Sequence, residues 1–325
     1  MFDTLFIAAS FFGYADEIKS ELERQGRRVI WFEDRPAIDA SSKALLRIAP
    51  ALMRKRVNAY CESIIQSARQ YNIRDVLIIK GEALSLKSIQ LLRQALPGAR
   101  FLLYYWDSYR NMPSASREKV ALVDRAFTFD IRDAQLDRRL RYRPLFYLRD
   151  YENLPADRQD IDILFLGTAH SDRYAVLQRL EKCIPSGLRF ERILYVPSKR
   201  LFYVRKLISP SFWHASSDEF RFSSLKKSDV LAFIRRSRIV VDVERAVQTG
   251  YTMRTIEMFG ASRKLITTNP LIEAADFYHP DNQAYVDRKA PRLSESFLYL
   301  GWNPKGRELL PKYSLAGWVE DVMGG

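Results

Sequence analysis

The sequence is poor in residues that bind metals or cross-link chains. It has two cysteines, Cys61 and Cys183, and three histidines among 325 residues. The cysteines stand far apart in helix-like segments, so they predict neither a disulfide framework nor a zinc cluster, and we expect two reduced, buried thiols. The histidines (His170, His214 and His279) lack metal-ligand spacing, which argues against a histidine-based metal enzyme.

Long apolar runs and nucleotide-binding fingerprints are also missing. The longest uncharged apolar runs, residues 4–14 and 101–106, are shorter than the roughly 20 residues that cross a bilayer, and Met1 opens no basic leader. The sequence therefore favours neither a secreted nor a membrane-spanning protein. Neither Gly-x-x-x-x-Gly-Lys-Ser/Thr nor Gly-x-Gly-x-x-Gly is present, which disfavours a phosphate-loop NTPase and an NAD enzyme.

Positive charge is in excess. Lys and Arg number 52 against 39 Asp and Glu, a net charge of +13, which favours an anionic partner. Residues 43–56 hold five basic and no acidic residues, and residues 196–238 hold ten basic and three acidic ones, both interleaved with apolar side chains. Each run is either a solvated face or part of a surface that docks on an anionic membrane. Nucleic acid is disfavoured as the partner, because no nucleic-acid motif accompanies the charge.

Apolar runs alternate with helical patterns along the first half of the chain, where a long helix is expected over residues 41–71. The predicted strands are residues 4–9, 28–32, 75–79, 100–105 and 125–129. These runs are almost continuously apolar, which is typical of parallel strands that helices cover on both faces. Residues 1–150 therefore predict a doubly wound α/β domain.

The same alternation restarts after a polar stretch. Residues 151–160 show no apolar periodicity and predict a linker. Further strands are expected at residues 161–167, 189–195, 238–243 and 264–268. The predicted fold class is thus α/β, with two tandem Rossmann-like domains at 1–150 and 161–325. Such sheets bind ligands at the carboxyl ends of their strands, so we expect the site in an interdomain cleft.

Polar residues follow several predicted strands. Asp107 and Asp130 come after the fourth and fifth strands, and the first strand of the second domain leads into Thr168, His170 and Arg173. A single aspartate at a strand end is commonly a helix cap or a turn former. Several such residues at one sheet edge instead indicate a ligand site.

Residues 240–269 form the most specific segment, with a strand, a polar loop, a helix that opens near Thr252 and a second strand. A helix amino terminus presents free N–H groups, and Arg254 adds a planar cation suited to bidentate phosphate contact. Glu257 lies one turn later and could accept hydrogen bonds from sugar hydroxyls. The alternative is an exposed i,i+3 ion pair between Arg254 and Glu257.

This segment resembles a known signature. Arg-Thr-Ile-Glu-x-x-Gly-Ala at 254–261, followed by Lys-Leu-Ile-Thr-Thr-Asn at 264–269, resembles the donor-binding region of GT-B glycosyltransferases, especially the CgeB-type proteins of bacterial lipopolysaccharide, capsule and exopolysaccharide clusters. Phe-Phe-Gly-Tyr at 11–14, Tyr-Trp-Asp-Ser at 105–108 and Phe-Leu-Gly-Thr-Ala-His-Ser-Asp-Arg-Tyr at 165–174 resemble further landmarks. The resemblance extends to about residue 288.

The resemblance implies a GT-B fold with the acceptor on the first domain, a nucleotide sugar on the second, and neither a cofactor nor an essential metal. The one Asp-x-Asp triplet, residues 160–162, enters a strand at the end away from the expected site. The residues implied to bind the donor are Gly167, Thr168, His170, Arg173, Gln248, Thr252, Arg254, Thr255 and Glu257. Those implied to bind the acceptor are Phe12, Gly13, Tyr14 and Trp106.

The sequence thus predicts a cytoplasmic glycosyltransferase, peripheral on the inner membrane face, that transfers a sugar to a lipid-linked or growing bacterial surface polysaccharide. An inverting enzyme needs a general base. Asp107 is the first candidate, with Asp16, Glu17 and Asp130 as substitutes. Two glutamates spaced eight apart are common in GT-B enzymes, but Thr249 stands eight before Glu257, so inversion and retention both stay open. The alternative is a non-catalytic or differently catalytic protein that binds sugar nucleotides or partners.

Overall fold

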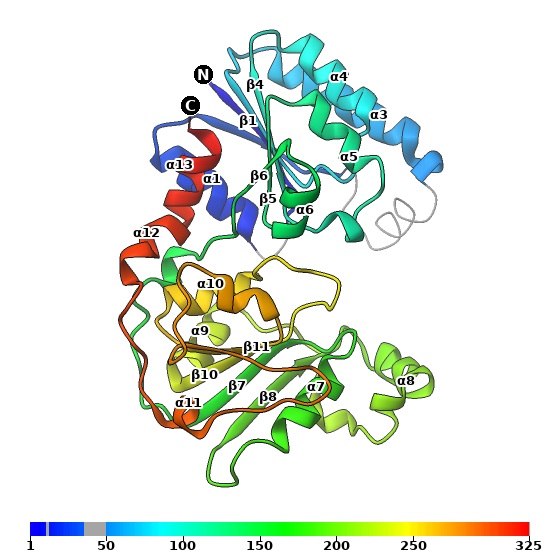
Figure 1. Cartoon of the computed structure of the whole chain (residues 1–325). Helices are drawn as coiled ribbons and strands as arrows, with labels where there is room; N and C mark the ends of the chain where they lie inside the picture. Colours follow the sequence, from blue (N-terminus) through cyan, green and yellow to red (C-terminus); the bar gives the residue numbers. More distant parts are fainter. Residues whose placement is uncertain (11–12, 36–49, 325) are drawn as a thin grey trace. The chain divides into compact units, whose positions relative to one another are not determined.

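The computed structural model describes residues 1–10, 13–35 and 50–324. Within these residues the chain forms two compact units, drawn in sequence colours in Figure 1. The first unit contains Met1–Leu145, Gln248–Gly250 and Leu315–Gly325, and the second contains Phe146–Val247 and Tyr251–Ser314. The chain therefore leaves the first unit after Leu145 and comes back to it for its last helix.

The first unit is built on a six-stranded parallel sheet in the order β2-β1-β3-β4-β5-β6. Its central strands are mainly apolar, and in β3 all five residues are buried. The strands are β1 (Thr4–Ile7), β2 (Val29–Phe32), β3 (Asp75–Ile79), β4 (Arg100–Tyr105), β5 (Arg125–Thr128) and β6 (Leu140–Tyr142).

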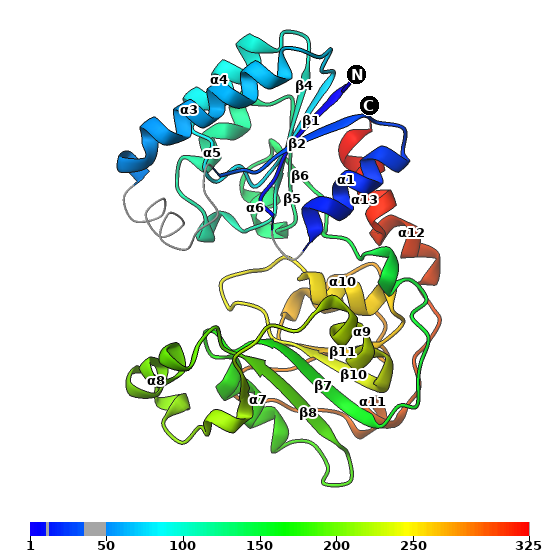
Figure 2. The same ribbon diagram turned by 180° about the vertical axis from the view of Figure 1, so that it is seen from behind.

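Helices cover both faces of this sheet. Figures 1 and 2 show α3 and α4 on one face and α1 with α13 on the other. Ser85 begins α4 as its cap, since its Oγ accepts a hydrogen bond of 3.0 Å from the backbone N–H of Ser88. The helices are α1 (Tyr14–Arg24), α3 (Pro50–Ala68), α4 (Leu86–Ala95), α5 (Ser116–Lys119), α6 (Ile131–Leu136) and α13 (Leu315–Met323).

The second unit repeats this design with a parallel sheet in the order β12-β11-β10-β7-β8-β9. Its strands are β7 (Ile161–Thr168), β8 (Phe190–Tyr195), β9 (Phe220–Arg221), β10 (Ser237–Asp242), β11 (Lys264–Thr267) and β12 (Gln283–Tyr285). Its helices are α7 (Arg173–Glu181), α8 (Lys199–Ile208), α9 (Lys227–Arg236), α10 (Met253–Gly260), α11 (Glu295–Tyr299) and α12 (Leu310–Tyr313). The predicted fold class, two tandem Rossmann-like α/β domains, is confirmed.

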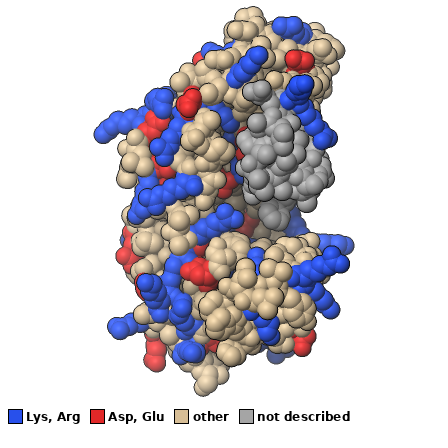
Figure 3. All heavy atoms as spheres, turned by 90° about the vertical axis from the view of Figure 1, so that its right-hand side faces the viewer, with Lys and Arg blue, Asp and Glu red and all other residues tan. Residues whose placement is uncertain are grey.

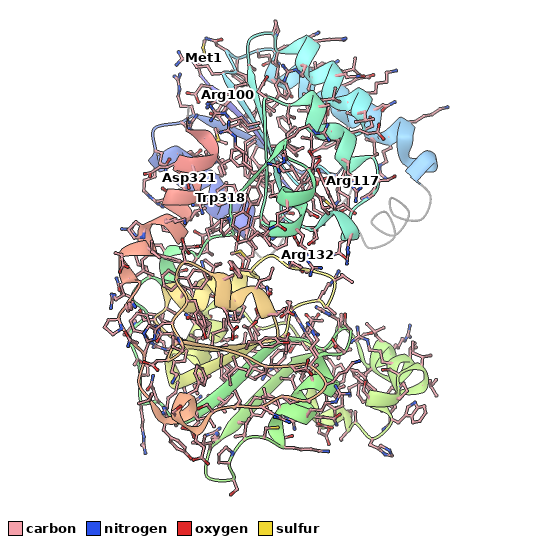
Figure 4. The ribbon with its side chains drawn as sticks, viewed as in Figure 1. Met1, Arg100, Arg117, Arg132, Trp318 and Asp321 are labelled. Carbon is pink, nitrogen blue, oxygen red and sulfur yellow. The ribbon has the colours of Figure 1, made fainter. Side chains whose placement is uncertain are left out.

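The last helix departs from the predicted division of the chain into 1–150, a linker at 151–160 and 161–325. Helix α13 belongs to the first unit, because its buried face packs on that unit's sheet. Trp318 is fully buried, its ring 4.8 Å from that of Tyr104 in β4 and nearly perpendicular to it, and Figure 4 shows it pointing from α13 toward the sheet. Arg100 in β4 donates to the Met323 carbonyl at 2.6 Å.

The two cysteines differ in burial. Cys61 is buried in the first core as predicted, whereas Cys183 is exposed just after α7, so the prediction of two buried thiols was wrong for Cys183. The long helix predicted over 41–71 is described as α3 from Pro50 to Ala68, and residues 41–49 lie outside the described part of the chain.

Candidate functional site

Arginines gather at the carboxyl edge of the second sheet. Arg173 spans two strand ends, because its Nε donates to the Val243 carbonyl after β10 at 2.6 Å and its Nη1 to the Thr168 carbonyl of β7 at 3.2 Å. Arg205 in α8 donates to the Ala169 carbonyl in the same loop. Backbone carbonyls therefore hold both guanidinium groups in place without neutralising their charge.

The pKa of His170 reflects the positive charge of this arginine cluster and the burial of the ring. Burial and the charges of Arg173, Arg245 and Arg205 lower the pKa of His170 to about 4. Its Nδ1 lies 3.1 Å from the hydroxyl of Ser171, a residue in the left-handed region with φ of 54°. The ring is thus uncharged at neutral pH, beside cations that would stabilise a bound phosphate.

Helix α10 begins at the same edge, directly after β10. Thr252 caps it, since its Oγ1 accepts a hydrogen bond of 3.2 Å from the backbone N–H of Thr255. Both threonine hydroxyls in turn donate to Asp242 Oδ2, at 2.5 and 3.0 Å. Thr252 and Thr255 were predicted to bind the sugar donor. In the structure their hydroxyl groups hold the start of α10 in a fixed position.

Arg254 and Glu257 form an i,i+3 ion pair within α10, with Nη1 and Oε2 at 3.0 Å. This pair is not exposed at the surface, because Glu257 is buried and Arg254 is largely buried. Tyr151 hydrogen-bonds with both side chains. A buried, hydrogen-bonded arginine at a helix start is pre-oriented, which lowers the entropy cost of gripping an anion.

A second network of acidic and basic side chains lies at this edge and was not predicted from the sequence. Glu244, just after β10, accepts from Thr268 Oγ1 at 2.7 Å and pairs with Arg288 Nη2 at 2.8 Å. Arg288 also contacts both carboxylate oxygens of Asp172, at 2.8 and 3.0 Å. Burial and the nearby Asp242 raise the pKa of Glu244. Glu244 and Thr268 follow predicted strands, so the rule that ligands bind at the carboxyl ends of strands could have identified them. Arg288 could not be identified in this way, because it follows β12, which was not predicted.

The remaining predicted donor residues are more scattered. Gly167 and Thr168 end β7, and a Cβ on Gly167 would lie 3.3 Å from the ring of Phe165, a tight contact, and 3.5 Å from Nη1 of Arg173, an ordinary one. Gln248 is assigned to the first unit, together with Thr249 and Gly250. The second unit by itself therefore brings together His170, Arg173 and the start of α10, but not Gln248.

The first unit carries its own charged cluster at the carboxyl edge of its sheet. Asp107, two residues beyond β4, has Oδ2 at 2.6 Å from Lys80 Nζ, and Lys80 also lies 3.3 Å from Glu82. Arg35, after β2, donates to Glu82 at 2.8 Å. Asp107 is half-buried, so its carboxylate is partly open to solvent while one oxygen is held by the ammonium group of Lys80.

The backbone that supports Lys80 is unusual. Lys80 and Gly81 both have left-handed conformations, with φ of 66° and 59°. Lys119 is buried, donates to the Gly81 carbonyl at 2.7 Å and has its pKa lowered to about 8 by burial. Asp34 accepts the next two amides, from Glu82 and Ala83, at 3.1 and 3.3 Å. A lysine in the left-handed region is rare and is kept only where its surroundings enforce it, often at functional sites.

Two of the predicted acceptor residues lie together. The rings of Tyr14 and Trp106 are 5.4 Å apart at an angle of 51°. Gly13 is the amino-terminal cap of α1 with φ of 75°, a conformation that glycine adopts without strain. Phe12 lies outside the described residues. Tyr14 and Trp106 therefore give the first unit an aromatic surface next to Asp107, of the kind that packs against sugar rings.

Asp130, a substitute base, makes several structural hydrogen bonds. It caps α6 and also accepts from Ser108 Oγ, from the amide and hydroxyl of Thr249 and from the amide of Gly250. Burial would raise its pKa, but the hydrogen bonds from Ser108 and Thr249 outweigh burial and hold the pKa below its usual value. A saturated, weakly basic carboxylate is a poor proton acceptor. Its contacts instead fasten the 248–250 segment.

The other two substitute bases, Asp16 and Glu17, lie in the first turn of α1. Asp16 is exposed and Glu17 is half-buried. Negative charges there complement the positive end of the helix dipole, which is sufficient reason for their presence.

The structure also bears on metals and membranes. In residues 1–10, 13–35 and 50–324, no group of three or more His, Cys, Asp or Glu side chains is arranged to hold a metal ion. No helix within those residues is long and apolar enough to span a bilayer. Of the first basic run, residues 43–49 lie outside the described part of the chain.

No family model and no curated protein matches the sequence. Solved structures do match. HepE of Anabaena, solved in complex with UDP and glucose, has a TM-score of 0.64 at 11% identity over 100% of both chains. An Escherichia coli trehalose-6-phosphate protein bound with UDP-2-fluoro glucose also reaches 0.64, at 10% identity over 99% of this chain and 98% of the other.

The chain has the GT-B fold. A UDP-forming trehalose-phosphate synthase from Burkholderia xenovorans agrees, with a TM-score of 0.61 at 9% identity and 99% coverage of both chains. At such identities the likeness concerns the fold alone, so the activity has to be argued from the side chains.

Proposed function

We propose that the protein is a glycosyltransferase that moves a sugar from a nucleotide-activated donor to a lipid-linked or growing bacterial surface polysaccharide. The observation that carries this proposal is the positive edge of the second sheet, where Arg173 and Arg205 are held by backbone carbonyls and where burial, together with nearby arginines, lowers the pKa of His170 to about 4. In open α/β sheets ligands bind at this edge. A site built from fixed guanidinium groups suits a nucleoside diphosphate.

The donor would be held mainly by the second unit. Arg254 would bind the diphosphate at the start of α10, and Glu257 would accept hydrogen bonds from hydroxyls of the ribose or the donor sugar. Gly167, Thr168, His170 and Arg173 would line the same edge, and Gln248, which belongs to the first unit, remains a predicted donor residue. Because the leaving group is a nucleoside diphosphate, cations fixed in advance would stabilise the charge that develops as it departs.

The acceptor would bind on the first unit, where the rings of Tyr14 and Trp106 offer a surface for a sugar. In an inverting reaction Asp107 would take the proton of the acceptor hydroxyl while that oxygen forms a bond to the anomeric carbon. The bond from this carbon to the phosphate oxygen breaks, and its electron pair leaves with the nucleoside diphosphate. We propose that no metal ion takes part. Addition of a chelator should therefore leave turnover unchanged.

A lipid-linked acceptor would be reached at the cytoplasmic face of a membrane, so the proposal includes peripheral association with an anionic bilayer. The second candidate function is a sugar-nucleotide protein with another activity or none. One neighbour favours this alternative, since a UDP-GlcNAc 2-epimerase from Methanocaldococcus jannaschii shares the fold with a TM-score of 0.51 at 10% identity.

Calorimetric titration with nucleoside diphosphates tests the donor site, and UDP is the first probe because two neighbours were solved with uridine nucleotides. Arg254→Lys keeps the charge but loses the planar fork, so we expect affinity for the preferred nucleotide to fall about tenfold or more. Arg158→Lys, an exposed site in the same unit, is the matched control. Unchanged affinity in both Arg254→Lys and Arg254→Ala would exclude the assigned role.

Turnover separates the two candidate functions. A glycosyltransferase usually hydrolyses a little donor when no acceptor is present, so slow release of UDP from a UDP-sugar supports transfer. Nucleotide binding with no release from any nucleotide sugar would favour a binding protein, and interconversion of the free sugars would favour an epimerase.

A further inference from the structure

One element of the second unit exposes apolar side chains instead of burying them. Helix α8 and the following 3₁₀ turn, η4 (Pro210–Phe212), project from the sheet margin between β8 and β9 (Figures 1 and 2). Phe202 and Phe212 anchor the element, because both are buried and their rings pack against that of Phe220 at 5.1 and 5.5 Å. These two phenylalanines therefore form the inner side of the element.

The outer side of the element is apolar. Leu207 and Ile208 are 80% and 73% exposed, and Tyr203, Val204 and Trp213 are each about half exposed. In an α-helix, positions 203, 204, 207 and 208 lie on one face. Five large hydrophobic side chains exposed within eleven residues form a patch of the kind that marks an interaction site.

Basic residues accompany this patch. Residues 199–217 include Lys199, Arg200, Arg205 and Lys206 and no Asp or Glu. None of the four makes an ion pair with a described carboxylate. Figure 3 looks onto the side from which α8 projects and shows Lys and Arg atoms around uncharged surface, with few acidic atoms. In hydrophobicity and charge, the surface is therefore complementary to an apolar layer that carries negative charge at its boundary.

An anionic lipid surface has this chemistry. Amphipathic helices that lie in the interface carry Trp and Leu on one side and Lys and Arg beside them. Each basic residue close to an anionic bilayer adds about fivefold in affinity. A second copy of the same positively charged face would instead be repelled, which makes self-association through this face a poorer explanation.

We propose that α8 and η4 dock the second unit on an anionic membrane, with Leu207, Ile208 and Trp213 inserted among the lipid headgroups and Lys199 and Arg200 against the lipid phosphates. This inference rests on the proposed function, which includes a membrane partner, and it assigns that partner to one surface. Arg205 also connects this element to the donor edge, since its guanidinium holds the Ala169 carbonyl next to His170.

Vesicle sedimentation tests the assignment without any need for turnover. The full chain is mixed with vesicles of phosphatidylcholine alone or with about a third phosphatidylglycerol. We expect binding to the anionic vesicles that weakens as salt rises from 50 to 500 mM. The triple variant Leu207→Ser, Ile208→Ser, Trp213→Ser should bind at least tenfold more weakly, and Lys199→Gln with Arg200→Gln should reduce binding and its salt dependence.

The matched control is Tyr299→Ser with Leu300→Ser, which removes two exposed apolar side chains from another part of the same unit. This variant should bind vesicles like the unaltered protein. Equal binding to neutral and anionic vesicles, no binding to either, or normal binding by the triple variant would overturn the proposal. So would a dimer in solution that the triple variant converts to a monomer, because the face would then serve protein association.

UDP affinity of the same variants distinguishes this proposal from the proposed function. The triple variant removes no residue of the donor edge, so its affinity and melting temperature should match those of the unaltered protein. Vesicle binding without nucleotide binding would contradict the proposed function and leave the docking surface standing. Nucleotide binding without vesicle binding would do the reverse.

Discussion

Lys80 Nζ lies 2.6 Å from Asp107 Oδ2, at the ends of two neighbouring strands of the first sheet. Lys80 reaches this position from a left-handed backbone conformation that few lysines adopt. Its ammonium group fixes the direction of the Asp107 carboxylate. The sheet edge therefore presents one oriented carboxylate beside the aromatic pair Tyr14 and Trp106.

If Asp107 is the base, Asp107→Asn should reduce turnover by about 10²–10⁴-fold while UDP affinity stays nearly unchanged. The melting temperature and the rate of the variant are measured together. A purely structural role of Asp107 predicts the opposite pattern, with a lower melting temperature and a nearly normal rate. Lys80→Met, which removes the ammonium group but keeps an aliphatic chain, should lower the rate less than Asp107→Asn does.

Asp130→Ala should destabilise the protein by about 1–3 kcal/mol, because the buried donors of Ser108, Thr249 and the start of α6 lose their acceptor. The carboxylate has a folded-state pKa below its usual 3.8, so its contribution is present above about pH 3.8 and is lost as the pH falls through the folded value. Chemical denaturation at pH 7 and below pH 3.8 measures the difference. A loss of turnover without a loss of stability would restore Asp130 as a candidate base.

The low pKa of His170 makes stability depend on pH. Since the folded-state pKa is about 4 and the ordinary value is 6.5, the unfolded chain binds more protons between these pH values. Stability should therefore rise as the pH increases from 4 to 6.5, and His170→Asn should flatten that rise. The exposed His214→Asn serves as the control. NMR titration of the ring should also show its pKa increasing when UDP binds, because the phosphates offset the charges of the arginines, and an unchanged pKa would place the nucleotide elsewhere.

Trp318→Ala should destabilise the first unit by about 3–5 kcal/mol, because the ring is fully buried against Tyr104. Trp213→Ala, which alters an exposed tryptophan of α8, should change stability by no more than about 0.5 kcal/mol. Denaturant unfolding measures both variants. Equal effects of the two substitutions would mean that α13 does not hold the first unit together.

The long apolar strands were predictable because burial on both faces leaves a continuous signal in the sequence. The strands β6, β9 and β12 were not, since each is an edge strand of two or three residues, too short for any periodicity. Side chains that follow such short strands were not predicted as part of the site either. Arg288 is an example, because it follows β12 and its partners, Asp172 and Glu244, lie far away in the sequence.

The candidate site shows the same limit. Asp107 was found from its place after a strand, but its partner Lys80 was not, since nothing in the sequence marks a lysine in the left-handed region. The structural contacts of Thr252 and Asp130 were not predicted either. Each looks like a ligand at a sheet edge until its hydrogen bonds to Asp242 or to Thr249 are seen.

The return of α13 to the first unit has a consequence for synthesis on the ribosome. The first sheet is translated before the second unit, and α13, which covers one of its faces, is translated after that unit. At 5–20 residues per second the nascent sheet would wait roughly ten to thirty seconds for its last helix. The unit made second can thus complete its fold first, while the apolar surface around Tyr104 stays open to chaperones until α13 has been synthesised.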